Sequence, residues 1–168
     1  SVMFLLLLSF VVFTPAVIAK SFSVGWELWY PYQYRNTTQK LVGVDFDIFN
    51  AIIKQANLEV DYTELPWKRH LNYIKSGKID IAMGASKTKE RELFSYFSNF
   101  YRVETVKLFV LTGMSNQIAL SSLKDLINSD FMIGVEGGYH YGSDYQQLIK
   151  KSEFQAHINE VIDIEKNI

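Results

Sequence analysis

The segment GASKTKERE, residues 84–92, combines small residues, hydroxyl groups and an arginine at a spacing suited to binding an anion. Gly84 leaves room for a ligand to approach the backbone, and Ser86 can donate a hydrogen bond. Thr88 stands three residues before Arg91, where it can cap a helix N-terminus that favours negative charge. Arg91 can hold a carboxylate through two parallel hydrogen bonds. The segment predicts a carboxylate-binding turn, although an ordinary solvated turn ending in a surface arginine would contain the same residues.

Aromatic side chains crowd the segment WELWYPYQY, residues 26–34, and Trp67 stands alone further along. Each of these places, like the 84–92 turn, follows a predicted strand. Because ligands of open α/β sheets bind outside the carboxyl ends of the strands, we expect the three places to share one edge. Aromatic faces can enclose a flat, aliphatic or cationic group. The combination indicates a site for a small zwitterion such as an amino acid, although the same aromatic residues could instead belong to the core.

The elements that must position these residues alternate between strand and helix patterns. Predicted strands cover 21–26, 58–65 and 78–83, and predicted helices cover 42–57 and 66–77. Asp45 and Asp47 lie near the start of the first helix, where carboxylates suit the helix dipole, and Pro66 opens the second. The order β-α-β-α-β predicts an α/β fold with a largely parallel sheet and helices on both faces. A further strand is predicted over 103–113.

The same alternation starts again after Gly113, which predicts a second α/β lobe. A short capped helix is expected over 121–129, a strand over 131–135 and a glycine loop leading into a helix over 136–151. We therefore divide the chain into a first lobe, 20–113, and a partial second lobe, 114–168. The last residues, VIDIEKNI, are typical of a polar helix start without a partner strand, so we expect the second lobe to be truncated.

The N-terminal residues 1–19 contain no charged side chain. A short apolar run, then Pro15, then Val17 and Ala19 as small residues around a cleavage point, is the layout of a secretory signal peptide. A membrane-spanning helix is the alternative, but spanning needs about 20 apolar residues and Pro15 shortens the run. Cleavage after Ala19 would deliver the protein to the periplasm.

The whole-chain composition narrows the possible functions. The 168 residues carry 17 Lys and Arg against 18 Asp and Glu, a net charge of -1, which gives no support for a nucleic-acid partner. Cysteine is absent, so disulfides and thiolate metal sites are excluded. The three histidines are scattered and show no metal or nucleophile–base spacing. We therefore expect a protein with no cofactor and no metal, and not an enzyme.

The motifs LVGVDFDIFNAI, SGKIDIAMGASKTKER, FSNFY and IGVEGG follow one another in this order. In that combination the chain resembles the family 3 extracellular solute-binding proteins, the periplasmic receptors of polar amino-acid ABC importers, over about residues 22 to 150. The resemblance implies the two-lobed, type II periplasmic-binding-protein fold, with the ligand held between the lobes. It also implies two partners, a small amino-acid-like ligand and the membrane permease of an ABC importer, and a monomeric protein.

The resemblance also implies roles for particular residues. Tyr30, or Trp29 beside it, and Trp67 would flank the ligand side chain. Three residues would bind the ligand carboxylate, namely Gly84, Ser86 and Arg91. Two residues on the glycine loop of the second lobe, Gly138 and Tyr139, would close over the ligand. The acidic residue for the ligand ammonium is expected beyond Ile168.

Some residues depart from the family pattern. The acidic residue expected just after the first strand appears as Glu27, in a segment that is one residue short. Arg69, next to the predicted stacking tryptophan, could reach into the cleft and favour an anionic ligand, or it could be a surface helix arginine. Two other functional classes stay open: a sensing or targeting module of a sensor kinase or lytic transglycosylase, and, as the weakest alternative, a periplasmic dehydratase.

Overall fold

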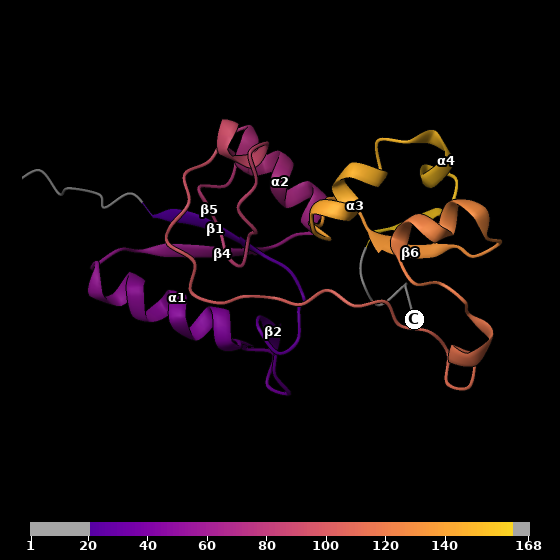
Figure 1. Ribbon diagram of the computed structural model, residues 1–168. Helices are drawn as coiled ribbons and strands as arrows, with labels where there is room; N and C mark the ends of the chain where they lie inside the picture. Colours follow the sequence, from indigo (N-terminus) through magenta and orange to yellow (C-terminus); the bar gives the residue numbers. More distant parts are fainter. Residues whose placement is uncertain (1–20, 163–168) are drawn as a thin grey trace, which may run out of the picture.

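The computed structural model describes residues 21–162 and shows two α/β lobes joined by a long extended segment (Figure 1). The predicted signal peptide and the last six residues lie outside the described range. The first lobe contains strands β1 to β5 and helices α1 and α2. The second lobe contains strands β6 and β7 and short helices. The predicted α/β, two-lobed architecture is therefore confirmed.

The first lobe is built on a parallel three-stranded sheet with the order β4-β1-β5. Strand β1, Phe22–Trp26, lies between β4, Val60–Glu64, and β5, Ile81–Ala82. Its register aligns Val24 with both Tyr62 and Ile81. The central position explains why Val24 and Trp26 are buried. A small antiparallel pair stands apart from this sheet, formed by β2, Tyr34–Arg35, and β3, Leu41–Val42.

Two helices cover opposite faces of this sheet (Figure 1). Helix α1, Val44–Gln55, starts two residues later than predicted because Gly43 has a φ of 130°, outside the helical region. A Cβ at Gly43 would meet the backbone oxygen of Tyr32 at 2.3 Å, so the aromatic loop packs directly against this helix start. Helix α2, Trp67–Lys75, follows Pro66 as its N-cap.

The second lobe packs several short helices on a parallel pair, β6, Ile133–Glu136, and β7, Ile158–Val161. The helices are the 3-10 helix η3, Leu123–Asn128, and the α-helices α3, Ser143–Leu148, and α4, Ser152–Gln155. Ser122 and Asp125 form a reciprocal cap at the start of η3. An apolar core joins these elements; its buried members are Leu126, Val135, Tyr145, Leu148 and Phe154.

Residues 158–161 form a strand that pairs with β6 and that the sequence did not predict. From residue 163 on, the predicted helix start VIDIEKNI lies outside the described residues. The predicted strand over 103–113 is wrong, because it is not formed. A strand is stable only when a neighbour accepts its backbone hydrogen bonds, and no described strand pairs with this segment. Instead it runs between the lobes with apolar side chains in solvent, as shown by the 90% exposure of Phe109. A 3-10 helix, η2 at Ser115–Gln117, follows it.

Candidate functional site

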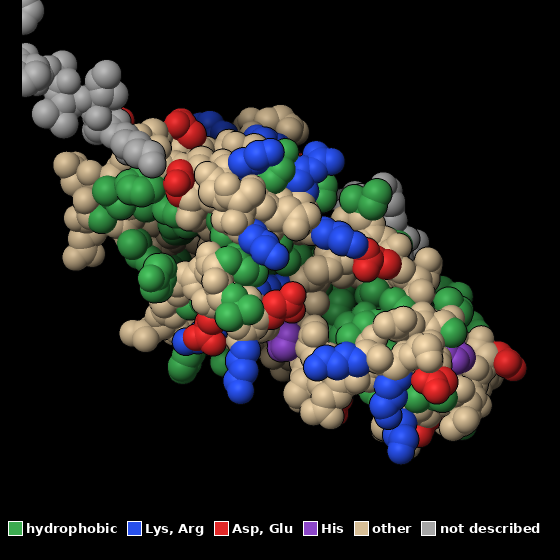
Figure 2. Space-filling model, turned by 90° about the horizontal axis from the view of Figure 1, so that it is seen from above, with side chains coloured by type: hydrophobic (Ala, Val, Ile, Leu, Met, Phe, Trp, Pro, Cys, Tyr) green, Lys and Arg blue, Asp and Glu red, His purple; other side chains and the backbone are tan. Residues whose placement is uncertain are grey.

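A cavity of about 1000 Å³ lies between the lobes and takes residues from both. Seen from above, hydrophobic side chains gather where the two lobes meet, while basic and acidic side chains are intermixed over the rest of this face (Figure 2). The first lobe contributes polar and aromatic lining, the segment between the lobes contributes apolar lining, and the second lobe contributes residues around β6. The lining residues used below are Glu27, Trp29, Trp67, Gly84, Ser86, Arg91 and Tyr139.

Residues 84–92 follow the carboxyl end of β5 and form a turn that leads into a short helix. Gly84 has a φ of 69°, which favours glycine, and a Cβ there would meet a carboxylate oxygen of Asp45 at 2.8 Å. The hydroxyl of Thr88 accepts a hydrogen bond from the backbone N–H of Arg91 at 3.2 Å. This bond reaches the first residue of the 3-10 helix η1, Arg91–Leu93, whose N-cap is Glu90 and not the predicted Thr88.

Arg91 is buried, with 7% of its surface exposed, so it is not a solvated surface arginine. One of its terminal nitrogens donates to the backbone oxygen of Ser86 and the other to that of Gly138, both at 2.8 Å. The guanidinium lies over the ring of Trp67, 5.4 Å from its centroid. Burial lowers the pKa of Arg91, while the nearby Glu90 raises it. The side chain therefore presents a desolvated positive charge at the boundary between the lobes.

Trp29 and Trp67 both line the cavity, with Tyr139 of the second lobe between them. The Tyr139 ring centroid lies 6.1 Å from that of Trp29 and 5.9 Å from that of Trp67. Trp67 also donates its indole N–H to the backbone oxygen of Gly138 at 3.1 Å. Tyr30 lies elsewhere: it is 73% exposed, packs on Tyr34, and is not among the lining residues. Tyr30 and Trp29 were the two candidates for one wall of the ligand site, and the structure places Trp29 at the cavity. Arg69 is exposed on α2 and does not line it either.

Glu27 has a larger role in the site than the sequence pattern indicated. It is buried in the cavity wall and accepts a hydrogen bond from the Tyr139 hydroxyl. The side chain of Glu136, at the end of β6, and the backbone of Trp67 are the other polar groups that act on this carboxyl. Burial is the largest influence and raises the pKa of Glu27.

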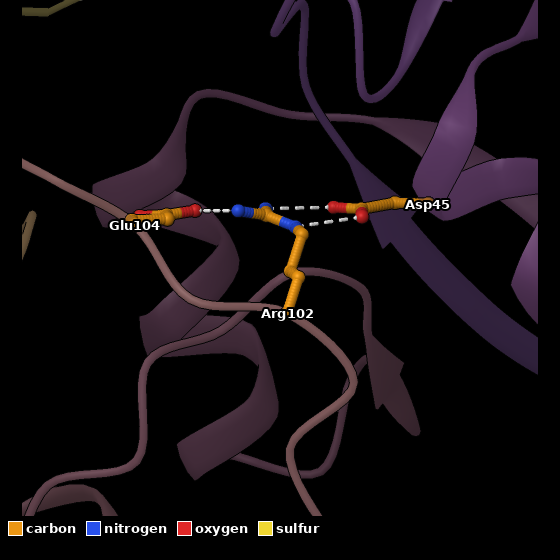
Figure 3. Close-up of polar contacts among 3 residues, drawn as sticks. All are labelled: Asp45, Arg102 and Glu104. Carbon is orange, nitrogen blue, oxygen red and sulfur yellow. Dashed lines mark hydrogen bonds and ion pairs between the residues drawn. The ribbon is translucent and has the colours of Figure 1, made fainter.

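A second charged group, Arg102, was missed at the sequence level. Its guanidinium makes two hydrogen bonds of 2.9 Å to the buried carboxylate of Asp45, and it also pairs with Glu104 (Figure 3). Burial alone would lower the pKa of Arg102, but the bonds to these carboxylates outweigh burial and raise it. The same guanidinium lies 4.7 Å from the Trp29 ring centroid.

The pair of Arg102 and Asp45 supports the site from behind. A carboxylate oxygen of Asp45 lies beside Gly84, and the guanidinium of Arg102 stacks on the ring of Trp29. Both the turn and one aromatic wall of the cavity therefore pack against this pair. The sequence indicated only a favourable interaction of Asp45 with the dipole of α1. Asp45 has that role as well, since it lies in the first turn of the helix. The sequence could hint at Arg102 only as a lone arginine after FSNFY. Within residues 21–162, no cluster of histidine, cysteine and acidic side chains could hold a metal ion.

Known proteins resemble this chain in sequence and in fold. Residues 22–167 match the bacterial extracellular solute-binding proteins, family 3. A solved ancestral arginine-binding protein bound to arginine is 25% identical, with a TM-score of 0.63; the match covers 87% of this chain and 62% of that one. The arginine-specific periplasmic binding protein STM4351 of Salmonella typhimurium is 22% identical, with a TM-score of 0.56 and coverages of 86% and 60%.

A third solved structure, an ancestral amino acid-binding protein described as a precursor of cyclohexadienyl dehydratase, is 22% identical, with a TM-score of 0.62. The match covers 88% of this chain and 64% of that one. The present chain thus spans less than two thirds of these solved relatives. The match to the family extends over nearly the whole described chain and includes both lobes and the cavity between them. The chain belongs to the bacterial extracellular solute-binding proteins, family 3.

Proposed function

We propose that this protein binds a small amino acid between its lobes and delivers it to the permease of an ABC importer. The observation that carries the proposal is the buried guanidinium of Arg91 beside the small-residue turn, facing a cavity between two lobes. A desolvated arginine next to exposed backbone is suited to a carboxylate. Family membership and the similarity to amino-acid-binding structures support the same conclusion.

In this proposal each part of the site takes one part of the ligand. The carboxylate binds at Gly84, Ser86 and Arg91. The ligand side chain extends between Trp29 and Trp67, whose faces exclude water from it. The glycine loop of the second lobe, with Gly138 and Tyr139, closes against the bound ligand.

The proposed location is the periplasm, after export through residues 1–19. The family is extracellular, which supports this location. Among residues 21–162 no helix combines the length and the apolar character needed to cross a membrane. We further propose that the protein binds rather than transforms its ligand, as the names of the arginine-binding structures suggest for their own proteins.

The proposal can be tested by calorimetric titration of the full-length protein with a panel of amino acids. Arg91→Ala should weaken binding by about 2–4 kcal/mol, because the ligand carboxylate would be left desolvated and unpaired. Arg91→Lys should recover only part of this loss, since lysine lacks the planar fork. Lys89→Ala is the matched control, because Lys89 is exposed on the same turn and should change affinity little. Equal losses for Arg91→Ala and Lys89→Ala would show that the turn acts only through its general charge.

A further inference from the structure

The second lobe places its own side chain where the proposed function puts the ligand side chain. Tyr139 has its ring against both Trp29 and Trp67, in an edge-to-face arrangement with Trp67 and tilted toward Trp29. These are the two aromatic walls proposed to enclose the ligand. The ring of Tyr139 therefore fills the slot between them from within the protein.

Other groups of this glycine loop also occupy positions proposed for parts of the ligand. The backbone oxygen of Gly138 accepts from the guanidinium of Arg91 at 2.8 Å, the group proposed for the ligand carboxylate. The Tyr139 hydroxyl donates to the buried carboxyl of Glu27. The loop thus offers an oxygen to Arg91, a flat ring to the tryptophans and a hydrogen-bond donor to Glu27.

We propose that Tyr139 is an internal substitute for the ligand side chain, and that the site accepts amino acids whose planar side chain ends in a hydrogen-bond donor. The proposal rests on the function proposed above. In the absence of ligand, Gly138 and Tyr139 occupy the binding groups and hold the lobes together. A ligand binds by displacing them, after which the loop covers the ligand instead.

The class of ligand follows from the groups that hold Tyr139. The Tyr139 ring meets Trp67 edge-to-face and Trp29 at a tilt, so the slot between the two tryptophans fits a thin, flat group better than a branched aliphatic side chain. Glu27 is buried and accepts from the Tyr139 hydroxyl, so an acceptor in place of that hydroxyl would leave two acceptors facing each other. Guanidinium and carboxamide groups meet both requirements, whereas a side-chain carboxylate is flat but lacks the donor.

Removal of the internal substitute should strengthen binding. If the occupied arrangement makes up about 90% of the ligand-free protein, Tyr139→Ala should lower the dissociation constant for L-arginine or L-glutamine by about tenfold. Tyr139→Phe keeps the ring but loses the bond to Glu27, so its affinity should lie between those of the wild-type protein and Tyr139→Ala. Tyr96→Ala removes an exposed tyrosine remote from the cavity lining and should change nothing.

The measurement is calorimetric titration of the full-length protein and these variants, with a urea unfolding curve for each to show that it is folded. A weaker affinity in both Tyr139→Ala and Tyr139→Phe would overturn the proposal, because it would show that Tyr139 supports the bound ligand rather than competing with it. An unchanged affinity in both folded variants would overturn it as well.

The ligand class is tested with a pair of equal shape, L-glutamine and L-glutamate. The wild-type protein should prefer L-glutamine by at least about tenfold, since only its side chain can donate to Glu27. Glu27→Gln should reduce this preference. Tight binding of L-glutamate or L-norleucine, with no preference for L-glutamine or L-arginine, would overturn the inference while leaving amino-acid binding intact. Absence of binding by every amino acid of the panel would overturn the proposed function itself.

Discussion

The two lobes bury different kinds of side chain. Five of the six buried polar or charged residues of the described chain belong to the first lobe: Glu27, Gln33, Asp45, His70 and Arg91. In the second lobe only Glu136 is of this kind, and the core is a continuous apolar cluster around Phe154. The first lobe also has the larger sheet and the longer helices, of 12 and 9 residues against 6 and 4.

This difference indicates how the two lobes divide the proposed recognition of the ligand between them. Buried charges are costly unless they are paired, and a site that holds them needs a rigid frame. The first lobe provides that frame, with the pair of Asp45 and Arg102 supporting the turn that contains Arg91. The second lobe contributes a backbone oxygen and a tyrosine on a glycine loop, next to Glu136, which is the buried charged residue named above for this lobe. Three predictions examine this division.

The largest effect is expected from breaking the buried pair of the first lobe. Asp45→Leu should lower the free energy of unfolding by about 3 kcal/mol, because the half-buried Arg102 keeps only Glu104 as a charged partner. The double variant Asp45→Leu with Arg102→Met should recover much of the loss, since an apolar pair needs no compensating charge. Urea unfolding followed by circular dichroism measures both. A double variant as unstable as the sum of the single variants would contradict the pairing as the cause.

A comparable effect of pH is expected from His70, which is fully buried in the first lobe. Burial lowers its pKa from 6.5 to about 4, so the folded protein holds the neutral form while the unfolded chain takes up a proton. The stabilisation is complete above pH 6.5 and is lost as the pH falls toward 4, by roughly 3 kcal/mol in total.

Urea unfolding at pH 7, 5.5 and 4 would measure this loss, with two variants for comparison. His70→Leu should reduce the dependence on pH, whatever its effect on stability at pH 7. Phe154→Ala, in the apolar core of the second lobe, should lower stability at every pH and leave the slope unchanged. A pH slope that survives His70→Leu undiminished would assign the effect to other groups.

The smallest effect concerns the cavity wall that both lobes share. Trp67→Ala should weaken ligand binding by at least about tenfold, or roughly 1.4 kcal/mol, because one aromatic face of the proposed ligand site is lost. Titration of the folded variant measures the change. Loss of folding together with unchanged affinity in the surviving folded fraction would show that Trp67 is a core residue.

Local patterns predicted the first lobe well because its signals are short-range. The apolar run before Gly84, the proline before Trp67 and the two acidic residues of α1 each specify one element, and the parallel β-α-β-α-β order follows from their sequence. The prediction failed where stability depends on a distant partner. The segment 103–113 has the alternation of a strand but finds no neighbour within residues 21–162, while β7 forms because Ile158–Val161 lie beside β6.

The sequence by itself determined the family, the α/β class, the second lobe and the turn at Gly84 to Arg91, because small residues, caps and periodic apolar positions act within a few residues of one another. Only the tertiary structure decided which aromatic residues face the cavity, placing Trp29 there and Tyr30 in solvent. It also brought Asp45 to Arg102 and Glu27 to Tyr139, pairs separated by 57 and 112 positions in the chain. Such contacts arise from the packing of whole elements, and no local pattern of residue types encodes them.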